Sequence, residues 1–198
     1  MPDLTTRRLE NLTDGIFAIA MTLLVLSLDF DKVTTSLTTA SLHQLLLAQL
    51  PKFFNYARSF LLLAIFWILH HQQFHEIKQT DRGHIWINMF VLMFIVLIPF
   101  STTLVGDYPD DWMSEVFFGA NMFIVGFLFS LNWYYSTRNY RLIERSFEAK
   151  QIALSKRRGL VTPAVSLLAI MVALVNTDLA SYTYLLIPII LYLPWFKK

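Results

Sequence analysis

Three histidines follow one another closely at the end of an apolar run, at His70, His71 and His75. On a helix, the four-residue spacing of His71 and His75 places both imidazoles on one face, as a metal site requires. No carboxylate stands at a matching helical spacing, although Glu76 is next in the sequence. The pattern therefore favours one histidine hydrogen-bonded inside a helical bundle, the others in contact with the cytoplasm, and no bound metal.

An acidic residue marks the first apolar segment. The uninterrupted apolar part, Ile16 to Leu28, is 13 residues long and too short to cross a bilayer alone. The polar turn with Asn11, Thr13 and Asp14 must therefore enter the membrane region or its rim. An ionisable residue there usually faces protein or a water-filled cavity. A position at the interface, beside an arginine, is an equally good interpretation of Asp14.

The same segment carries an apolar stripe. Ile19, Leu23 and Leu26 follow the i, i+4, i+7 spacing of one helix face, with Gly15 below them and Thr22 beside them. Such a stripe is most often simple helix packing. It indicates a pore only if copies of this helix meet on an axis.

The elements that carry these residues are membrane helices. The chain has 198 residues, of which 56% are hydrophobic and 15% charged, and its mean hydropathy is +0.51. A soluble core of this size cannot hide so much apolar surface. Cysteine is absent, which excludes disulfides and thiolate metal sites. We expect a single all-α domain over residues 1–198 with six transmembrane helices, at about 9–28, 45–70, 84–105, 112–135, 160–175 and 179–195.

The loop cations predict the orientation. One side collects 13 of the 16 lysines and arginines: Arg7, Arg8, Lys78, Arg82, Arg138, Arg141, Arg145, Lys150, Lys156, Arg157, Arg158, Lys197 and Lys198. The other side has Lys32 and is acidic, with Asp29, Asp31, Asp107, Asp110, Asp111 and Asp178. We therefore expect a multi-pass protein of the cell (inner) membrane with both termini in the cytoplasm.

Two cations, Lys52 and Arg58, lie against this trend in the second span. They are expected either to pair with the acidic residues of the outer side or to reach lipid headgroups. The basic segment 137–158 is expected to be a solvated cytoplasmic loop, and contact with anionic lipid is the alternative. Pro163 is expected in a first helical turn, and Pro99 and Pro188 inside spans that they should kink.

The beginning of the first predicted helix resembles the signature of a known family. Arg8-Leu9-Glu10-Asn11-Leu12-Thr13-Asp14-Gly15 resembles the R-x-x-x-F-S-D-G signature of the transmembrane protein 175 family, which comprises the lysosomal potassium channel and its bacterial homologues. Leu12 replaces the aromatic residue, and Thr13 replaces serine and keeps the hydroxyl. Trp67-x-x-His70-His71, and Asn88 followed by Pro99-Phe100-Ser101-Thr102, are also similar to the family. The resemblance covers roughly residues 8–105.

The resemblance implies a non-enzymatic potassium-permeable channel without a cofactor, with potassium ions as the permeant species. It implies the bacterial form, a homotetramer in which the first helices surround a central pore. The constriction would be Ile19, Leu23 and Leu26, with Thr22 as a hydroxyl layer, in place of a carbonyl filter. The T-V-G-Y-G filter loop is indeed absent from the sequence.

The signature residues are expected to have a structural role first. We expect Arg8, Thr13 and Asp14 to hold the first helix against the next two spans through Trp67, His70 or His71, and Asn88. Two rival functions remain open, a proton-coupled transporter that uses Asp14 and a histidine, and a metal-dependent membrane transporter or oxidoreductase built on His70, His71 and His75.

Overall fold

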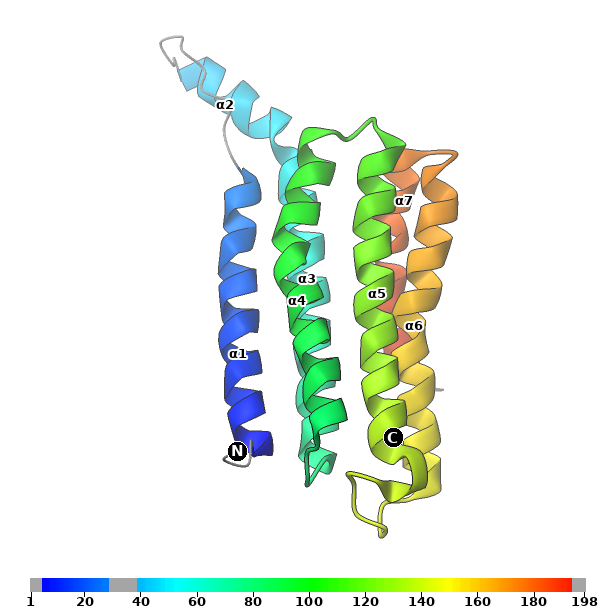
Figure 1. Ribbon diagram of the computed structural model, residues 1–198. Helices are drawn as coiled ribbons and strands as arrows, with labels where there is room; N and C mark the ends of the chain where they lie inside the picture. Colours follow the sequence, from blue (N-terminus) through cyan, green and yellow to red (C-terminus); the bar gives the residue numbers. More distant parts are fainter. Residues whose placement is uncertain (1–4, 29–38, 194–198) are drawn as a thin grey trace.

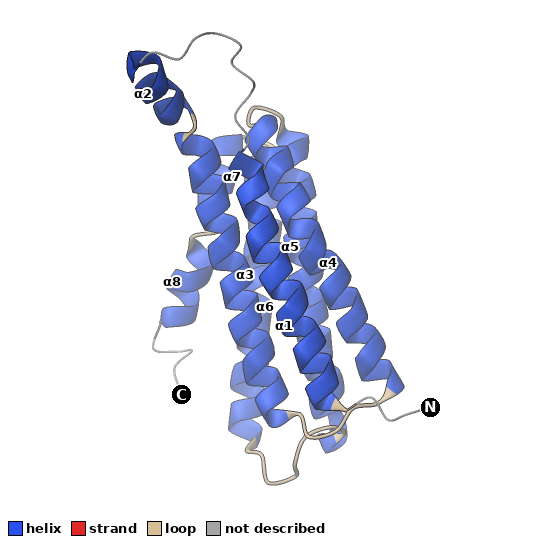
Figure 2. Ribbon diagram, turned by 90° about the vertical axis from the view of Figure 1, so that its left-hand side faces the viewer, coloured by secondary structure: helices blue, strands red, loops and turns tan. Residues whose placement is uncertain are grey.

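The computed structural model describes residues 5–28 and 39–193, and within these ranges the regular structure is helical. Figures 1 and 2 show a bundle of long, roughly parallel or antiparallel helices, with α2 tilted away from it. The elements are α1 (Thr6–Leu23), continued by the 3₁₀ helix η1 (Leu24–Leu28), then α2 (Thr39–Ala48), α3 (Leu50–Glu76), α4 (Arg82–Asp107), α5 (Trp112–Thr137), η2 (Arg138–Tyr140), α6 (Ala149–Ala173), α7 (Thr177–Thr183) and α8 (Leu186–Tyr192).

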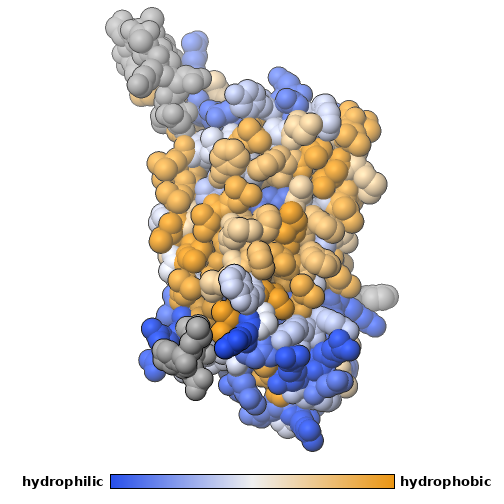
Figure 3. Space-filling view, viewed as in Figure 1, coloured by the Kyte–Doolittle hydropathy of each residue, from blue (hydrophilic) through white to orange (hydrophobic). Residues whose placement is uncertain are grey.

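Four helices in the described part of the chain are long and apolar enough to cross a bilayer. They are α1 with η1, α3, α4 and α5. The surface between the two ends of the bundle is correspondingly apolar, and hydrophilic residues gather at the ends (Figure 3). The protein is therefore an integral membrane protein.

The last two predicted spans are shorter than a bilayer is thick. In α6 the stretch after Arg158, residues 159–173, is free of charged residues. At a rise of about 1.5 Å per residue it extends roughly 22 Å, against a hydrocarbon core of about 30 Å. The pair α7 and α8 covers Thr177–Tyr192, which is also shorter than a full span.

The basic segment 137–158 is only partly a loop, which corrects one prediction. Helix α6 begins at Ala149, so Lys150, Lys156, Arg157 and Arg158 lie on its first turns. Pro163 consequently lies inside α6 and not in its first turn. Its ring fits there because α5 has Gly126 opposite, where an added Cβ would lie 2.7 Å from the Pro163 Cδ.

The predicted start of the second span at residue 45 is also wrong. Helix α3 begins at Leu50, with a proline in its first turn, and runs to Glu76. Pro51 has no N–H to donate to the preceding turn, so the hydrogen bonds of α2 cannot continue into α3. Residues 45–48 therefore belong to α2.

The last apolar segment is broken by Pro188. Helix α7 ends at Thr183 and α8 begins at Leu186. A proline ring clashes with the carbonyl four residues before it, here that of Tyr184. Tighter turns replace the helical bonds at this point, from the Leu185 N–H to the Tyr182 carbonyl (3.0 Å) and from the Ile187 N–H to the Tyr184 carbonyl (3.1 Å).

The loop between η2 and α6 is docked against the turn between α3 and α4. The Lys78 N–H donates to the Leu142 carbonyl at 2.9 Å, and Ile77 and Ile143 form an isolated antiparallel bridge. Leu142 and Ile143 pack in a small apolar cluster with Leu9 of α1. These contacts connect three parts of the basic end of the bundle.

Asp81 is the polar centre of this end. Its carboxylate accepts hydrogen bonds from the His84 N–H (2.9 Å), the Tyr135 hydroxyl (3.0 Å) and the Arg141 Nε (2.9 Å). Burial alone would raise the pKa of Asp81, but these three donors outweigh it and hold the pKa below its ordinary value. Asp81 thus caps α4 and ties it to α5 and to the following loop.

Candidate pore-lining face and its supporting network

Helix α1 has one face in the bundle and one face outside it. Its buried face, Leu9, Thr13, Phe17, Ala20, Leu24 and Ser27, packs toward α3 and α4. The predicted constriction residues lie on the other face, where Ile19 is 56%, Leu23 39% and Leu26 67% exposed. The stripe of Ile19, Leu23 and Leu26 is therefore not covered by other helices of the same subunit.

Thr22 lies on the same exposed side. Its hydroxyl donates a hydrogen bond to the Ile19 carbonyl at 2.8 Å. Because the proton is used within the helix, the oxygen lone pairs remain available as acceptors. A cation near this face would meet an oxygen ligand at Thr22.

Gly15 lies at the beginning of this face and has no side chain, so a neighbouring helix could approach the backbone closely there. A Cβ built at Gly15 would meet no other atom within 4 Å in the subunit. No packing inside the subunit therefore requires a glycine at this position. Leu12, in place of the aromatic residue of the signature, is also exposed.

Asp14 and Trp67 form one link of the predicted network. The Trp67 Nε1–H donates to the Asp14 Oδ1 at 2.9 Å, and the Trp67 ring lies over His71 with 6.0 Å between the centroids. The carboxylate of α1 is thereby connected to α3. Asp14 itself stays exposed on the open side of the helix.

The remaining links differ from those predicted. Arg8 is exposed, and the hydroxyl of the buried Thr13 has no hydrogen-bond partner in the described part of the chain. Asn88 does not bond to α1 but donates to the His84 carbonyl (2.8 Å) and to the Asn132 side chain (3.1 Å). The sequence placed Asn88 correctly inside the bundle but gave it the wrong neighbour.

Two residues of the buried network, Gln73 and Asn132, were missed. The Asn132 side chain donates to the Gln73 side chain at 3.0 Å, and Gln73 donates to the Phe129 carbonyl at 3.2 Å. Together with Asn88 they join α3, α4 and α5. For Asn132 the available signal was an amide within an apolar run, since such a group needs a partner in a dry environment. Gln73 lies in the polar stretch 70–76 and carried no such signal.

The structure decides which histidine is internal. His70 is 3% exposed and stacks on Phe74 with 4.1 Å between the centroids. His71 and His75 are exposed, as expected for histidines in contact with the aqueous phase. No group of three or more His, Asp or Glu residues that could hold a metal occurs among residues 5–28 and 39–193.

One of the two unexpected cations has the predicted kind of partner. Lys52 forms an ion pair with Asp107 at 2.7 Å. The partner of Arg58 is different: its guanidinium lies 3.5 Å from Glu115 and 2.5 Å from the Ser181 hydroxyl. Arg58 is 2% exposed, so it does not reach the headgroups. Asp29 and Asp31, the other predicted partners, lie outside the described residues.

Comparisons with known proteins find relatives of this chain. A family model described as the endosomal/lysosomal potassium channel TMEM175 matches residues 8–99, which contain the signature, Trp67, His70 and Asn88. A potassium channel of Streptomyces collinus is 33% identical over 146 residues, which are 72% of this chain and 69% of that protein. This chain belongs to the TMEM175 family.

A second relative is a potassium channel of Chamaesiphon minutus, 25% identical over 178 residues, 88% of this chain and 87% of that protein. The crystal structure of a lysosomal potassium-selective channel TMEM175 homologue from the same organism has a TM-score of 0.83, with 97% of this chain and 98% of that chain covered. The sequence identity is 22%, so this likeness shows the fold. TMEM175 proteins are ion channels, and the chain is not an enzyme.

Proposed function

We propose that the protein is a potassium-permeable cation channel, a homotetramer of six-helix subunits in which four α1 helices line a central pore. The observation that carries the proposal is the uncovered face of α1, with three large apolar side chains in register and a threonine hydroxyl among them. The potassium channels named among its relatives support the choice of ion.

Four copies of this face would make a narrow apolar neck. Ile19, Leu23 and Leu26 would form rings about 5–6 Å apart, given a rise of about 1.5 Å per residue. The narrowest ring is assigned to Ile19, because Gly15 and Ala18 nearby permit close approach of the helices. Water leaves such a neck easily, so the closed state is a hydrophobic gate that opens when the helices spread or rotate.

Thr22 supplies the polar layer of the proposed pore. Thr22 is exposed on this face of α1, and its hydroxyl proton is bound to the Ile19 carbonyl. Four such oxygens would accept contacts from a partly dehydrated cation. Potassium preference is assigned to this layer.

The proposed orientation places the basic end of the bundle in the cytoplasm. Most of the described loop cations lie at the end that carries the turn between α3 and α4 and the loop before α6, whereas Asp107, Asp110, Asp111 and Asp178 lie at the opposite end (Figure 1). This asymmetry is typical of a protein of the cell membrane with a cytoplasmic N-terminus.

Recording from purified protein in a planar bilayer, under potassium and sodium gradients, tests the proposal. Unitary ohmic currents that reverse near the potassium equilibrium potential are expected.

Ile19→Asn should keep the tetramer and raise basal conductance, because the amide holds water in the neck, and Thr22→Ala should reduce the preference for potassium over sodium. The matched control is Val25→Asn, an exposed position off the stripe. If Ile19→Asn leaves the current of a tetramer unchanged, or if no unitary currents occur, the pore assignment or the channel function is wrong.

A further inference from the structure

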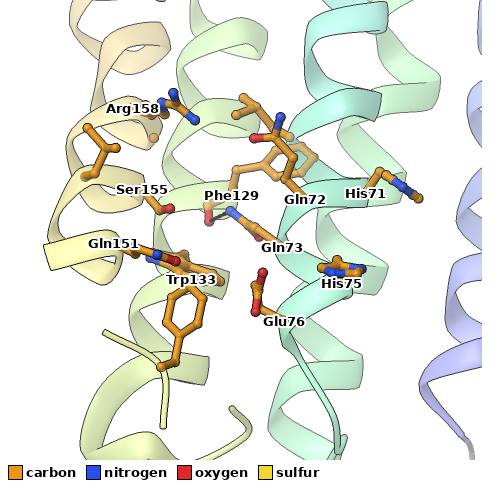
Figure 4. A pocket seen from close by; sticks show the side chains of 14 residues that line it. His71, Gln72, Gln73, His75, Glu76, Phe129, Trp133, Gln151, Ser155 and Arg158 are labelled. Atoms are coloured by element: carbon orange, nitrogen blue, oxygen red, sulfur yellow. Dashed lines mark hydrogen bonds between the residues drawn. The ribbon is translucent and has the colours of Figure 1, made fainter. Parts of the chain in front are cut away.

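A groove opens between α3 and α6 at the basic end of the bundle. Both helices flank α5, but a cavity of about 470 Å³ separates them at this end. Its lining comes from the last turns of α3, from Phe129 and Trp133 of α5, from Phe147 of the loop and from residues 151–159 of α6 (Figure 4). This volume is typical of a small-molecule site.

A second, apolar cavity adjoins the first. It measures about 200 Å³ and is lined by Ile65, Ile68 and Leu191 together with Leu69, Gln72 and Arg158. The last three residues also line the larger cavity. Residue 65 lies seven residues, or roughly 10 Å, nearer the bilayer centre than residue 72. The two cavities therefore form one groove, with most of its charged and amide side chains toward the membrane surface and the aliphatic side chains of Ile65, Ile68 and Leu191 in the smaller cavity.

Two opposite charges line the polar part in a fixed order. Arg158 belongs to both cavities and so lies where the apolar part begins. Glu76 lines the larger cavity one helical turn beyond Gln72, farther from the bilayer centre. In Figure 4 Arg158 lies on the upper, membrane side and Glu76 on the lower side, with Ser155 and Gln151 facing α3 across the cavity.

We propose that this groove binds a zwitterionic phospholipid with a primary ammonium headgroup, of the ethanolamine type. An acyl chain lies against Ile65, Ile68 and Leu191, the phosphate at Arg158, and the ammonium at Glu76. The order of the charges carries the proposal, because a phospholipid has its phosphate next to the glycerol and its ammonium farther out. Gln72, Gln151 and Ser155 supply neutral hydrogen-bonding groups between the two charges.

The choice of a zwitterionic headgroup follows from Glu76. A purely anionic headgroup would bring a second negative charge toward this carboxylate, whereas an ammonium forms a charge-assisted hydrogen bond with it. The neighbouring cations Lys156 and Arg157 are exposed and do not line either cavity. They attract any anionic surface without distinguishing headgroups, so they provide the control for a specific site.

Binding of defined lipids to the purified, assembled protein tests the proposal by native mass spectrometry. Dioleoyl-phosphatidylethanolamine and dioleoyl-phosphatidylglycerol are compared, with soluble phosphoethanolamine as the headgroup alone. The expected order of affinity is phosphatidylethanolamine above phosphatidylglycerol, with no retained phosphoethanolamine. Arg158→Ala should weaken both lipids about tenfold or more, and Arg157→Ala should weaken neither.

Two further variants separate the headgroup from the chain. Glu76→Gln should abolish the preference for phosphatidylethanolamine over phosphatidylglycerol, and Ile68→Trp should reduce binding of both lipids by filling the apolar part of the groove. Equal affinity of the unmodified protein for the two lipids would overturn the zwitterionic assignment. Equal effects of the Arg157 and Arg158 substitutions, or undiminished binding by Ile68→Trp, would show surface attraction or occupation of the groove by another subunit instead.

Discussion

Asp14 is a charged residue on the open side of α1 with a partner on a neighbouring helix. Its hydrogen bond with Trp67 fixes the N-terminal half of α1 against α3, while the proposed pore residues begin one turn later. In the proposed pore, Asp14 would hold the helix and the residues from Ile19 onward would face the ion. Loss of a hydrogen bond to a charged group costs about 1.5–3 kcal/mol.

Asp14→Ala is therefore expected to reduce tetramer recovery and thermal stability before it changes ion preference. Size-exclusion chromatography, thermal unfolding and reversal potentials measure the three properties on the same preparation. Trp67→Phe, which keeps an aromatic ring but removes the N–H donor, should reproduce part of the loss. A variant with normal assembly and altered selectivity would mean that Asp14 faces the permeating ion.

The Arg58–Glu115 pair is buried among α3, α5 and α7. Ser181 also bonds to Glu115, and the Arg58 guanidinium lies 4.3 Å from the centre of the Phe118 ring. Removing one partner of a buried ion pair leaves an uncompensated charge, which costs about 3–5 kcal/mol, whereas replacing both by apolar residues is often nearly neutral. Removing one partner of the pair is therefore expected to lower the stability more than replacing both partners by apolar residues.

Arg58→Met alone is expected to lower the thermal stability strongly, and Arg58→Met combined with Glu115→Leu should recover most of it. Thermal unfolding in one detergent measures both variants. Lys52→Met is the control, because the Lys52–Asp107 pair is partly exposed and worth about 1 kcal/mol or less. A double variant as unstable as the single one would show that the pair contributes net stability.

At the scale of elements, α5 and α6 approach closely where a glycine faces a proline. A Cβ at Gly126 would lie 2.7 Å from Cδ and 3.1 Å from the backbone nitrogen of Pro163. Neither atom can move without shifting α6. The close contact is therefore specified jointly by two residues on different helices.

Gly126→Ala is expected to destabilise the protein by about 1–3 kcal/mol through overpacking, measured by thermal unfolding. Alanine has a higher helix propensity than glycine, so without the close contact the substitution would stabilise the helix. A loss of stability therefore indicates that the contact with Pro163 is present. Gly106→Ala in α4 is the matched control, because its Cβ would meet only the flexible Lys52 side chain at 3.6 Å. If the two variants are equally stable, α5 and α6 do not approach as closely as described.

The hydrogen bonds to Asp81 join the start of α4, the end of α5 and the following loop. Asp81 has a lowered pKa in the folded protein, so the unfolded chain binds the proton more readily. The stabilisation is complete above the unfolded pKa, which is about 3.9 for an aspartate. It is lost as the pH falls through the lower folded pKa.

Asp81→Asn retains an acceptor for the His84 N–H but removes the charge that faces Arg141. We expect a loss of about 1 kcal/mol or less at pH 7, since the ion pair is partly exposed. The difference in melting temperature from the unmodified protein should narrow below about pH 4. A constant difference from pH 7 to pH 3 would contradict the role of the charge.

At the scale of the whole molecule, the two ends of the bundle differ in charge. The turn between α4 and α5 is acidic, and the loop before α6 lies at the opposite, basic end (Figure 1). A membrane retains basic loops on the cytoplasmic side. The direction of the proposed pore depends on this arrangement.

Single cysteines at Asp110 and at Ser146 are expected to be labelled from opposite sides of the membrane by an impermeant maleimide. Both positions are exposed, and the chain has no native cysteine to interfere. The cysteine at 146 should react only when the cytoplasmic side is accessible. Labelling of both from the same side would refute the topology.

Hydropathy, charge and motif were sufficient for the membrane class, four of the spans and the family. These are sums over consecutive residues or patterns on one helix, and the bilayer selects for them directly. The spacing of Ile19, Leu23 and Leu26 likewise predicted a common face, because helix geometry is local. The role of that face as a pore stays a prediction.

Only the tertiary structure decided which residues meet across helices. In the structure His70 is buried and His71 is exposed. Asn88 bonds to Asn132, and Arg58 pairs with Glu115 instead of an aspartate of the outer side. The structure also extended α6 back to Ala149 and divided the last segment at Pro188. Such choices depend on the rotation of each helix and on its neighbours. A sequence pattern cannot contain them, because hydropathy says that a residue is inside but not which residue it faces.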